Sequence, residues 1–392
     1  MKSKEVNSKR VPAYRDAGFE LSDAARAADA FSIEAQNERV PEIYIYSRYR
    51  NPTVVAAEEE IMKHEESEWA LLTESGMAAV DVALSIFQEG KNINPWLFFN
   101  EIYGGTISFA ESVLRKRRGL DIHYFSPVKE KYDLTEFESA VEKLKPQIVY
   151  IESISNPMLI VPDAEGIIRI ARKYKAKVIV DNTFATPELW KPLSDGADLV
   201  IHSVTKYLSG HGNITAGVLC GNDPDLMRAA VEYRKYSGHM LSADDAYRLH
   251  TQIQTFRLRF NRQCDNAQHI AKLLKSSKLV ERVLYPGLKT HPTHEEALKL
   301  FGSKGFGGII TFDFRGTMTN EKKVVRDEFI RLVSEWIRVV PSLGDPDSII
   351  LPVESVWGAK YPEPGMIRLS AGFEETGKIS GIISSALNSI AS

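Results

Sequence analysis

A carboxylate and a lysine each follow a short apolar run in the middle of the chain. Asp181 directly follows residues 178–180, and Lys206 comes shortly after residues 199–201. The two are 25 positions apart, and at the ends of successive strands they can face one crevice. Taken singly, Asp181 suits a turn or helix cap, and Lys206 suits an exposed surface.

Together these two residue types indicate a particular chemistry. A lysine amine can form an imine with an aldehyde, and a carboxylate can hold a ring nitrogen protonated, as pyridoxal 5′-phosphate (PLP) requires. The hydroxyls of Ser203 and Thr205 just before the lysine suit a phosphate. A second phosphate element is predicted where residues 69–72 turn through Gly76 into a helix whose first N–H groups can face an anion, although such glycines are common.

Two further residues suit a binding site. Tyr103, before Gly104-Gly105, offers an aromatic plane that can stack on a flat ring, or it can be a half-buried core tyrosine. Arg368 alternates with apolar residues on an expected strand, where an unpaired charge would be costly. It therefore belongs either to a structural salt bridge or to a site for a substrate carboxylate.

The elements that would position these residues begin near position 51. Short runs that are apolar on both faces alternate with helix-length segments, which is typical of a mostly parallel sheet covered by helices. Expected strands are 69–72, 96–99, 122–125, 148–151, 178–180 and 199–201, and expected helices include 77–88 and 106–117. A helical region over 244–277 precedes a smaller α+β pattern, with strands at 309–314, 349–351 and 367–370 and a closing helix from 375.

These patterns predict an α/β protein in three parts. Residues 1–55 form an arm of little periodicity that finds its contacts elsewhere in an assembly. Residues 56–250 form the large cofactor-binding domain, and residues 251–392 form the smaller C-terminal domain.

Composition excludes several other classes of protein. The net charge of −3 over 392 residues gives no basic footprint for nucleic acid. The two cysteines, Cys220 and Cys264, favour a reducing compartment, and the N-terminus lacks an apolar signal segment. Since no run approaches the roughly 20 apolar residues that span a bilayer, we expect a cytoplasmic protein without a membrane partner. No metal site is expected.

The sequence resembles the Cys/Met-metabolism (trans-sulfuration) family of fold type I PLP enzymes. The matching segments run in order along nearly the whole chain: 46–48 with 51–53, 75–79, 103–106, Glu152 with Asn156-Pro157, 181–184, 203–207, 286–288, 342–344 and 367–370. The resemblance implies the PLP-dependent transferase fold of type I. It also implies a small amino-acid substrate and a homotetramer built from two active-site dimers.

The resemblance further implies a role for each matched residue. Lys206 would carry the cofactor and move protons, and Asp181, followed by Thr183, would pair with the ring nitrogen. Tyr103 would stack on the ring and assist proton transfer. The phosphate would be bound by Gly76, Met77, Ser203 and Thr205, together with Tyr46 and Arg48 of a neighbouring subunit. The substrate carboxylate would be bound by Arg368, Asn156 and Ser342.

The expected reaction is γ-elimination or γ-replacement on a sulfur amino acid or activated homoserine. Val340-Pro341 stands where many cystathionine-handling members have a glutamate, and Asp345 resembles methionine γ-lyases and O-acetylhomoserine sulfhydrylases. Gly105, however, replaces the cysteine usual in methionine γ-lyases. A γ-lyase is the first reading and a cystathionine γ-synthase or O-acetylhomoserine sulfhydrylase the second, followed by a β-lyase, an aminotransferase and a non-catalytic interaction protein.

One segment departs from the family pattern. Residues 354–361, which include Trp357 and Tyr361, replace the usual Thr-His segment before the arginine. These two aromatic residues can shape an unusual substrate pocket or pack as ordinary loop residues.

Overall fold

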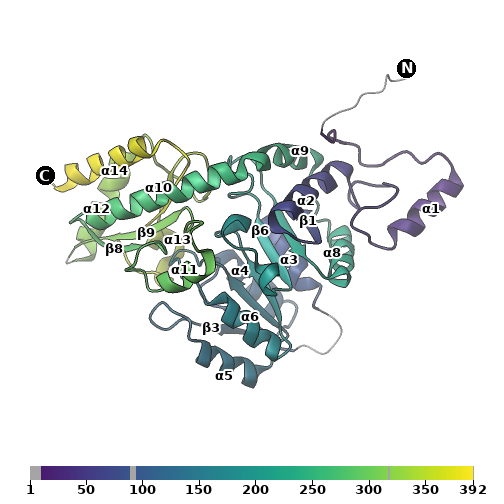
Figure 1. The fold of residues 1–392 in the computed structure, drawn as a ribbon, viewed down its shortest axis with the longest axis horizontal. Coiled ribbons are helices and arrows are strands. Elements are labelled where there is room, and N and C mark those ends of the chain that lie inside the picture. The colour runs from purple at the N-terminus through teal and green to yellow at the C-terminus, as the bar shows by residue number, and fades with distance from the viewer. Residues whose placement is uncertain (1–9, 89–93, 317, 392) are drawn as a thin grey trace, which may run out of the picture.

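A seven-stranded sheet forms the centre of the larger part of the molecule (Figure 1). The computed structural model describes residues 10–88, 94–316 and 318–391. The strand order is β1-β7-β6-β5-β4-β2-β3, and only the pairings of β7 with β1 and β6 are antiparallel. The strands are β1 (Trp69–Thr73), β2 (Trp96–Phe99), β3 (Ile122–Phe125), β4 (Ile148–Glu152), β5 (Lys177–Asp181), β6 (Leu199–Ser203) and β7 (Gly217–Gly221).

Helices cover this sheet, which gives the expected α/β architecture. Their bounds are α2 (Pro52–Glu65), α3 (Gly76–Ser85), α4 (Gly104–Phe109), α5 (Leu134–Leu144), α6 (Ala164–Lys173), α7 (Thr186–Leu189) and α8 (Pro224–Ser237). The helix expected over 106–117 is in fact α4 followed by a π-helix at Ala110–Arg115. Short 3₁₀ turns lie at Pro192–Asp195, Ile253–Thr255 and Gly358–Lys360.

The central strands are apolar because both of their faces are covered. Residues 178–180 of β5 and 199–202 of β6 are buried throughout. Since β4, β5 and β6 run in parallel, their carboxyl ends meet at one edge of the sheet. This edge carries Glu152, Asp181 and Ser203, and ligands of open α/β sheets bind at such an edge.

A second sheet of five strands forms the smaller part, in the order β10-β11-β12-β9-β8. Its strands are β8 (Val280–Leu284), β9 (Ile309–Phe314), β10 (Arg338–Val339), β11 (Ile349–Pro352) and β12 (Ile367–Ser370). The helices of the C-terminal half of the chain are α9 (Ala243–Gln252), α10 (Phe256–Ser276), α11 (His294–Phe301), α12 (Thr319–Val333), α13 (Val353–Trp357) and α14 (Thr376–Ala391). Of these, α9 packs against α2, and the buried residues of α9 and α11 belong to the core of the large sheet.

The long helix α10 joins the two hydrophobic cores. Phe256 and Phe260 near its start pack in the core of the large sheet, whereas Ile270 and Leu274 pack in the core of the small one. The domain limits expected near residue 250 therefore remain a prediction, because one continuous helix serves both cores.

The N-terminal segment extends away from the large sheet and contains one helix, α1 (Ala24–Glu34), where the sequence suggested little regular structure (Figure 1). Asp23 caps this helix by accepting a hydrogen bond from Arg26 N. The segment is tied to α8 through Lys235, whose Nζ lies 2.8 Å from a Glu34 carboxylate oxygen. Within the described residues, no helix is both long enough and apolar enough to span a bilayer.

A buried ion cluster fixes the start of the large domain. The Glu58 carboxylate lies within 2.5 Å of Arg50 and 3.5 Å of Arg234, and all three side chains are at least 96% buried. Glu58 also accepts the backbone N–H of Leu72 on β1 at 2.9 Å. Burial lowers the pKa of Arg234 to about 9, so the guanidinium stays charged at neutral pH and needs this carboxylate.

Candidate active site

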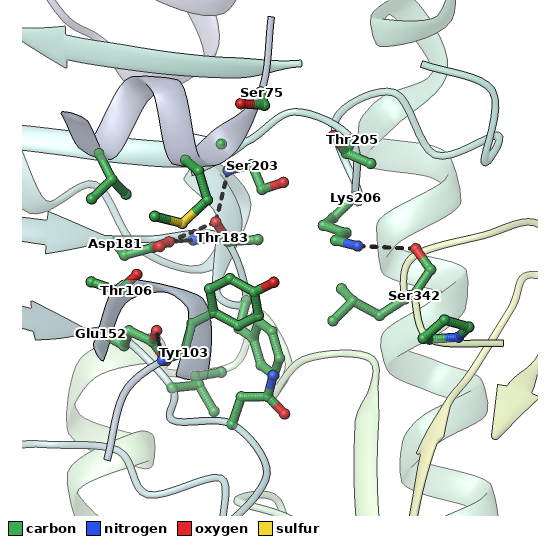
Figure 2. A pocket seen from close by; sticks show the side chains of 18 of the residues that line it. Ser75, Tyr103, Thr106, Glu152, Asp181, Thr183, Ser203, Thr205, Lys206 and Ser342 are labelled. Atoms are coloured by element: carbon green, nitrogen blue, oxygen red, sulfur yellow. Dashed lines mark hydrogen bonds between the residues drawn. The ribbon is translucent and has the colours of Figure 1, made fainter. Parts of the chain in front are cut away.

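A cavity of about 250 Å³ lies at the carboxyl edge of the large sheet. The structure brings eleven of the thirteen expected site residues to its wall: Gly76, Met77, Tyr103, Asn156, Asp181, Thr183, Ser203, Thr205, Lys206, Ser342 and Arg368. Figure 2 shows Asp181 and Thr183 on one side, Lys206 and Ser342 on the other, and the ring of Tyr103 between them in this view.

Asp181 is held in place by its own turn. Its Oδ1 accepts the backbone N–H of Thr183 at 3.0 Å and the Thr183 hydroxyl at 2.6 Å, while the same hydroxyl accepts Ser203 N–H at 2.8 Å (Figure 2). Burial raises the pKa of Asp181, and the two Thr183 contacts oppose that rise. The other oxygen, Oδ2, has a weak contact with the Tyr150 hydroxyl at 3.5 Å. Asp181 is therefore both a turn cap and a cavity-lining acid, and Oδ2 can accept a strong donor.

Lys206 lies inside the cavity and not on the surface. Its Nζ donates to the Ser342 hydroxyl at 3.0 Å (Figure 2). Burial lowers the pKa of Lys206, Arg368 lowers it further, and Asp345 opposes both effects. A lysine with a lowered pKa is neutral more often at working pH, which is the form that acts as a nucleophile or base.

The opposite end of the cavity suits an anion. Ser75 begins α3 by accepting Ala78 N–H at 3.1 Å, and helix geometry leaves the N–H groups of Gly76 and Met77 without an intrahelical acceptor. A Cβ on Gly76 would lie 3.0 Å from the Ser203 Cβ, so glycine keeps this space open. These amides, with the nearby Ser203 hydroxyl, form a phosphate-sized group of donors.

Thr205 is also at the cavity wall, but its hydroxyl already has partners. It donates to Ala216 O at 3.1 Å and accepts Ala216 N–H at 3.0 Å. These bonds fix the turn that carries Lys206 against the strand β7.

Tyr103 stands at the beginning of α4 with a half-exposed side chain, so it is not a core tyrosine. Its backbone N–H donates to the Glu152 carboxylate at 2.5 Å. Burial and the nearby Asp181 raise the pKa of Glu152 well above its ordinary value. Glu152 thus fixes the Tyr103 loop, and its protonation would remove one negative charge from the cavity.

Arg368 has the contacts of a carboxylate receptor. It donates to Asn156 Oδ1 at 3.2 Å and to Ser342 O at 2.7 Å, which are both neutral acceptors. Among the described residues no carboxylate forms a salt bridge with it, and its buried Nε has no hydrogen-bond partner. Burial lowers the pKa of Arg368 to about 10, so the charge persists at neutral pH and calls for an anionic ligand.

Tyr46 and Arg48 do not reach this cavity within the chain. Arg48 donates to Lys235 O at 2.7 Å, and its guanidinium carbon lies 5.5 Å from the centre of the Tyr46 ring. The Tyr46 side chain is 39% exposed. Their expected role in a neighbouring subunit stays a prediction.

The cavity also includes residues to which the sequence analysis gave no role. Glu152 has a position equivalent to Asp181 at the end of the adjacent strand, and inspection of every strand end would have found it. The remaining lining residues are Ser75, Val80, Thr106, Ile154, Phe184, Thr215, Pro341 and Leu343. Most are apolar or small, so only their position in the fold identifies them.

His239 joins two carboxylates on either side of the start of α3. His239 contacts the Glu74 carboxylate at 2.7 Å through Nδ1 and the Asp81 carboxylate at 3.0 Å through Nε2. Burial alone would lower the pKa of His239, but its hydrogen bonds to these carboxylates raise it. The bridge therefore connects the residue before Ser75 to the middle of α3.

These observations fit the cofactor that the sequence predicts. Lys206 offers an amine, Asp181 offers an oxygen for a protonated ring nitrogen, and the start of α3 offers phosphate donors at a place where a Cβ would intrude. The backbone of Gly217, at the start of β7, lies directly against the residue that caps α3, because an added Cβ on Gly217 would lie 2.2 Å from Ser75 O. The described residues contain no group of three or more His, Cys, Asp or Glu side chains that could hold a metal ion.

Comparison with known proteins agrees with this geometry. The model of the Cys/Met metabolism PLP-dependent enzyme family matches residues 1–388. An L-methionine gamma-lyase of Fusobacterium nucleatum subsp. polymorphum is 33% identical, with 97% of this chain and 93% of that protein covered. A cystathionine beta-lyase of Lactococcus lactis subsp. cremoris is 35% identical over 85% of this chain and 86% of that protein.

A solved structure gives the same result for the fold. The cystathionine gamma synthase of Xanthomonas oryzae pv. oryzae, in complex with cystathionine, superimposes with a TM-score of 0.84 at 26% identity. The match covers 97% of this chain and 92% of that one. This chain is thus a member of the Cys/Met metabolism family of PLP-dependent enzymes and has their type I fold.

Proposed function

We propose that this protein catalyses γ-elimination on a sulfur amino acid, with methionine or cystathionine as the substrate. The observation that carries the proposal is the shared cavity of Lys206, Asp181 and Arg368. An amine that can carry protons, a group that suits the cofactor ring and a group that suits an amino-acid carboxylate share this cavity, which supports the proposal. The names of the relatives, which are carbon–sulfur lyases and a γ-synthase, support this reaction class.

The cofactor would be held by the residues described above. Lys206 would bind its aldehyde carbon, Asp181 its ring nitrogen, and Ser203 with the amides of Gly76 and Met77 its phosphate. Tyr103 would cover one face of the ring. When bound, PLP supplies an electron sink that stabilises negative charge at the substrate Cα.

Lys206 would perform the proton transfers after the substrate amine has displaced it. Its lowered pKa favours a neutral amine that would take the proton from Cα and pass it on to the aldehyde carbon of the cofactor. Neutral again, the amine could then take a proton from Cβ, so that the Cγ–S bond can break. The Ser342 hydroxyl, 3.0 Å from Nζ, would orient the amine between these positions. The Tyr103 hydroxyl would donate a proton to the departing thiolate.

Arg368 would orient the substrate during these steps. Its Nε–H and the second N–H of an η nitrogen could donate to the two oxygens of the substrate carboxylate, while Asn156 and Ser342 O keep the guanidinium in place. Bidentate recognition of this kind fixes direction as well as affinity. The Cα–H bond is then held toward Lys206.

We further propose that the active unit is a homotetramer of two active-site dimers in the cytoplasm. The exposed Tyr46 ring and the adjacent Arg48 form a cationic–aromatic pair outside this chain's cavity, and they suit the phosphate of a second copy. Both cysteines, Cys220 and Cys264, are free and buried, which suits a reducing compartment.

A γ-replacement enzyme is the second candidate. Val340-Pro341 precedes Ser342 in place of an acidic residue, and Asp345 follows Gly344, a pattern that resembles O-acetylhomoserine sulfhydrylases as well as methionine γ-lyases. The same residues would then serve a reaction in which a thiol adds at Cγ.

Product analysis tests the proposal. The purified protein with PLP is incubated with methionine, with cystathionine, and with O-acetylhomoserine in the presence and absence of sulfide or cysteine. 2-Oxobutanoate and a thiol formed without an added nucleophile would support the γ-lyase. If a thioether or homocysteine forms only when the nucleophile is present, the protein is the γ-replacement enzyme and not the γ-lyase. Pyruvate formed from cystathionine would indicate a β-lyase.

A further inference from the structure

The segment 353–361, which includes the residues 354–361 that depart from the family pattern, lies against Arg368 of the cavity. It comprises α13 and the following 3₁₀ turn, and it connects β11 to the approach of β12. Val353 and Tyr361 are buried with Met366 in a small hydrophobic cluster of their own, and Trp357 and Met158 pack against that cluster. The segment is therefore a packed element of the C-terminal part, in which Trp357 and Tyr361 have defined positions.

Trp357 covers one face of the Arg368 guanidinium. The guanidinium carbon lies 5.5 Å from the centre of a Trp357 ring, within the range of a cation–π contact. The two hydrogen bonds to Asn156 and Ser342 lie at the edges of the guanidinium. With one face covered by indole and one N–H of each η nitrogen bound, the orientation of the remaining N–H donors, which include Nε–H, is fixed.

Tyr361 ties this arrangement to the loop that carries Tyr103. Its ring lies 6.5 Å from the Trp357 ring in an edge-to-face arrangement, and its hydroxyl donates to the Glu101 carboxylate. Lys360 adds a hydrogen bond from Nζ to Asn100 O at 2.8 Å. The segment thus connects Arg368 of the small sheet to the residues just before Tyr103.

From these contacts we propose that Trp357 is a positioning residue for substrate-carboxylate binding, acting through Arg368. Since it covers the guanidinium and not the reacting carbon atoms, its contribution is the same for every α-amino acid, whatever its Cγ substituent. Uniform binding of this kind changes KM and leaves kcat nearly unaltered. The inference rests on the proposed role of Arg368 as the carboxylate receptor.

The test compares Trp357→Leu with the holoenzyme on methionine and on O-acetylhomoserine. We expect KM to rise about 10-fold for both substrates, as a desolvated cation–π contact implies, with kcat within about 2-fold. The dissociation constant of glycine, which is measured from the change in cofactor absorbance on binding, should rise by the same factor. Glycine carries the carboxylate without a Cγ substituent, so it reports on binding alone.

Three variants complete the experiment. Trp357→Phe keeps an aromatic face and should retain most of the affinity for glycine and for the substrates. It also allows the proposal to be tested if Trp357→Leu fails to fold. Tyr361→Phe loses the hydroxyl bond to Glu101 and should show a smaller rise in KM. Trp336→Leu is the matched control, because Trp336 has a comparable contact with Lys378, 4.2 Å from its ring, at a place that is not part of the cavity wall.

The outcomes separate this inference from the function on which it rests. An unchanged glycine affinity in Trp357→Leu, or KM changes that differ more than about threefold between the two substrates, would overturn the positioning role. Arg368→Lys should raise both KM values. If it does not, the carboxylate assignment itself is wrong, whereas a rise with Arg368→Lys but none with Trp357→Leu overturns this inference alone.

Discussion

Replacing Thr183 by valine should weaken both the fold and the cofactor site. The Thr183 hydroxyl donates to Asp181 Oδ1 at 2.6 Å and accepts Ser203 N–H at 2.8 Å, and the residue is buried. Valine keeps the shape but makes neither bond. Loss of a hydrogen bond to a charged group costs about 1.5–3 kcal/mol, and an unsatisfied buried N–H costs about 1–3 kcal/mol.

Because the two losses share one hydroxyl and can relax together, we expect a net loss of about 2–4 kcal/mol in the free energy of unfolding. The pKa of Asp181 is already raised by burial, and loss of the Thr183 hydroxyl should raise it further. A carboxyl with a raised folded-state pKa adds stability below its unfolded-state pKa of about 4 and loses that contribution as pH rises through the folded value. The deficit of the valine variant should therefore be larger at pH 8 than at pH 4.

Urea unfolding of the wild type, Thr183→Val and Thr183→Ser at both pH values measures this effect. Serine keeps the hydroxyl and should recover most of the stability. The affinity for PLP, measured by cofactor release on dilution, should fall at least about 10-fold for valine, because a less ionised Asp181 pairs poorly with a protonated ring nitrogen. A valine variant within about 0.5 kcal/mol of the wild type and with equal cofactor affinity would refute this reasoning.

Three further perturbations have defined outcomes. Glu58→Gln should cost about 3–5 kcal/mol in urea unfolding, because Arg234 stays buried without a counter-charge; a change below about 1 kcal/mol would contradict the cluster's role. His239→Gln should remove a pH-dependent stabilisation, since the raised pKa of His239 gives stability below about pH 6.5 that is lost as pH rises through the folded-state value. Parallel stability curves of the two proteins between pH 5.5 and pH 9 would disprove that role. Gly76→Ala should weaken PLP binding more than it lowers the melting temperature of the cofactor-free protein, because the new methyl group meets Ser203 at 3.0 Å; equal PLP affinity would place the phosphate elsewhere.

Much of the site was predictable because the carboxyl ends of parallel strands lie at one edge of the sheet. Buried apolar strands identified the sheet, and parallel strands put Asp181 and the segment of Lys206 at one edge. The alternation around Arg368 placed it on a strand, but only the structure shows that its hydrogen-bond partners are neutral and that its Nε has none, which favours the proposed receptor over a salt bridge. The spacing of residues does not carry that information.

Contacts between distant segments account for what the sequence did not predict. Trp357 meets Arg368, and Tyr361 meets Glu101, which lies 260 positions away. The helix α1 has a cap at Asp23 but a mostly exposed surface, so its hydrophobic pattern was weak. The position of Arg48 likewise follows from a tertiary contact with Lys235 of α8, which local patterns do not reveal.

The central claim is that Lys206 binds the cofactor and carries the catalytic protons. The most direct test is borohydride reduction of the holoenzyme, followed by proteolysis and mass spectrometry of the peptides. We predict a phosphopyridoxyl group on the peptide of Lys206. We also predict that the Lys206→Ala protein is folded, lacks this modification and does not turn over methionine or O-acetylhomoserine. Modification of another lysine, or near-full activity of Lys206→Ala, would contradict it.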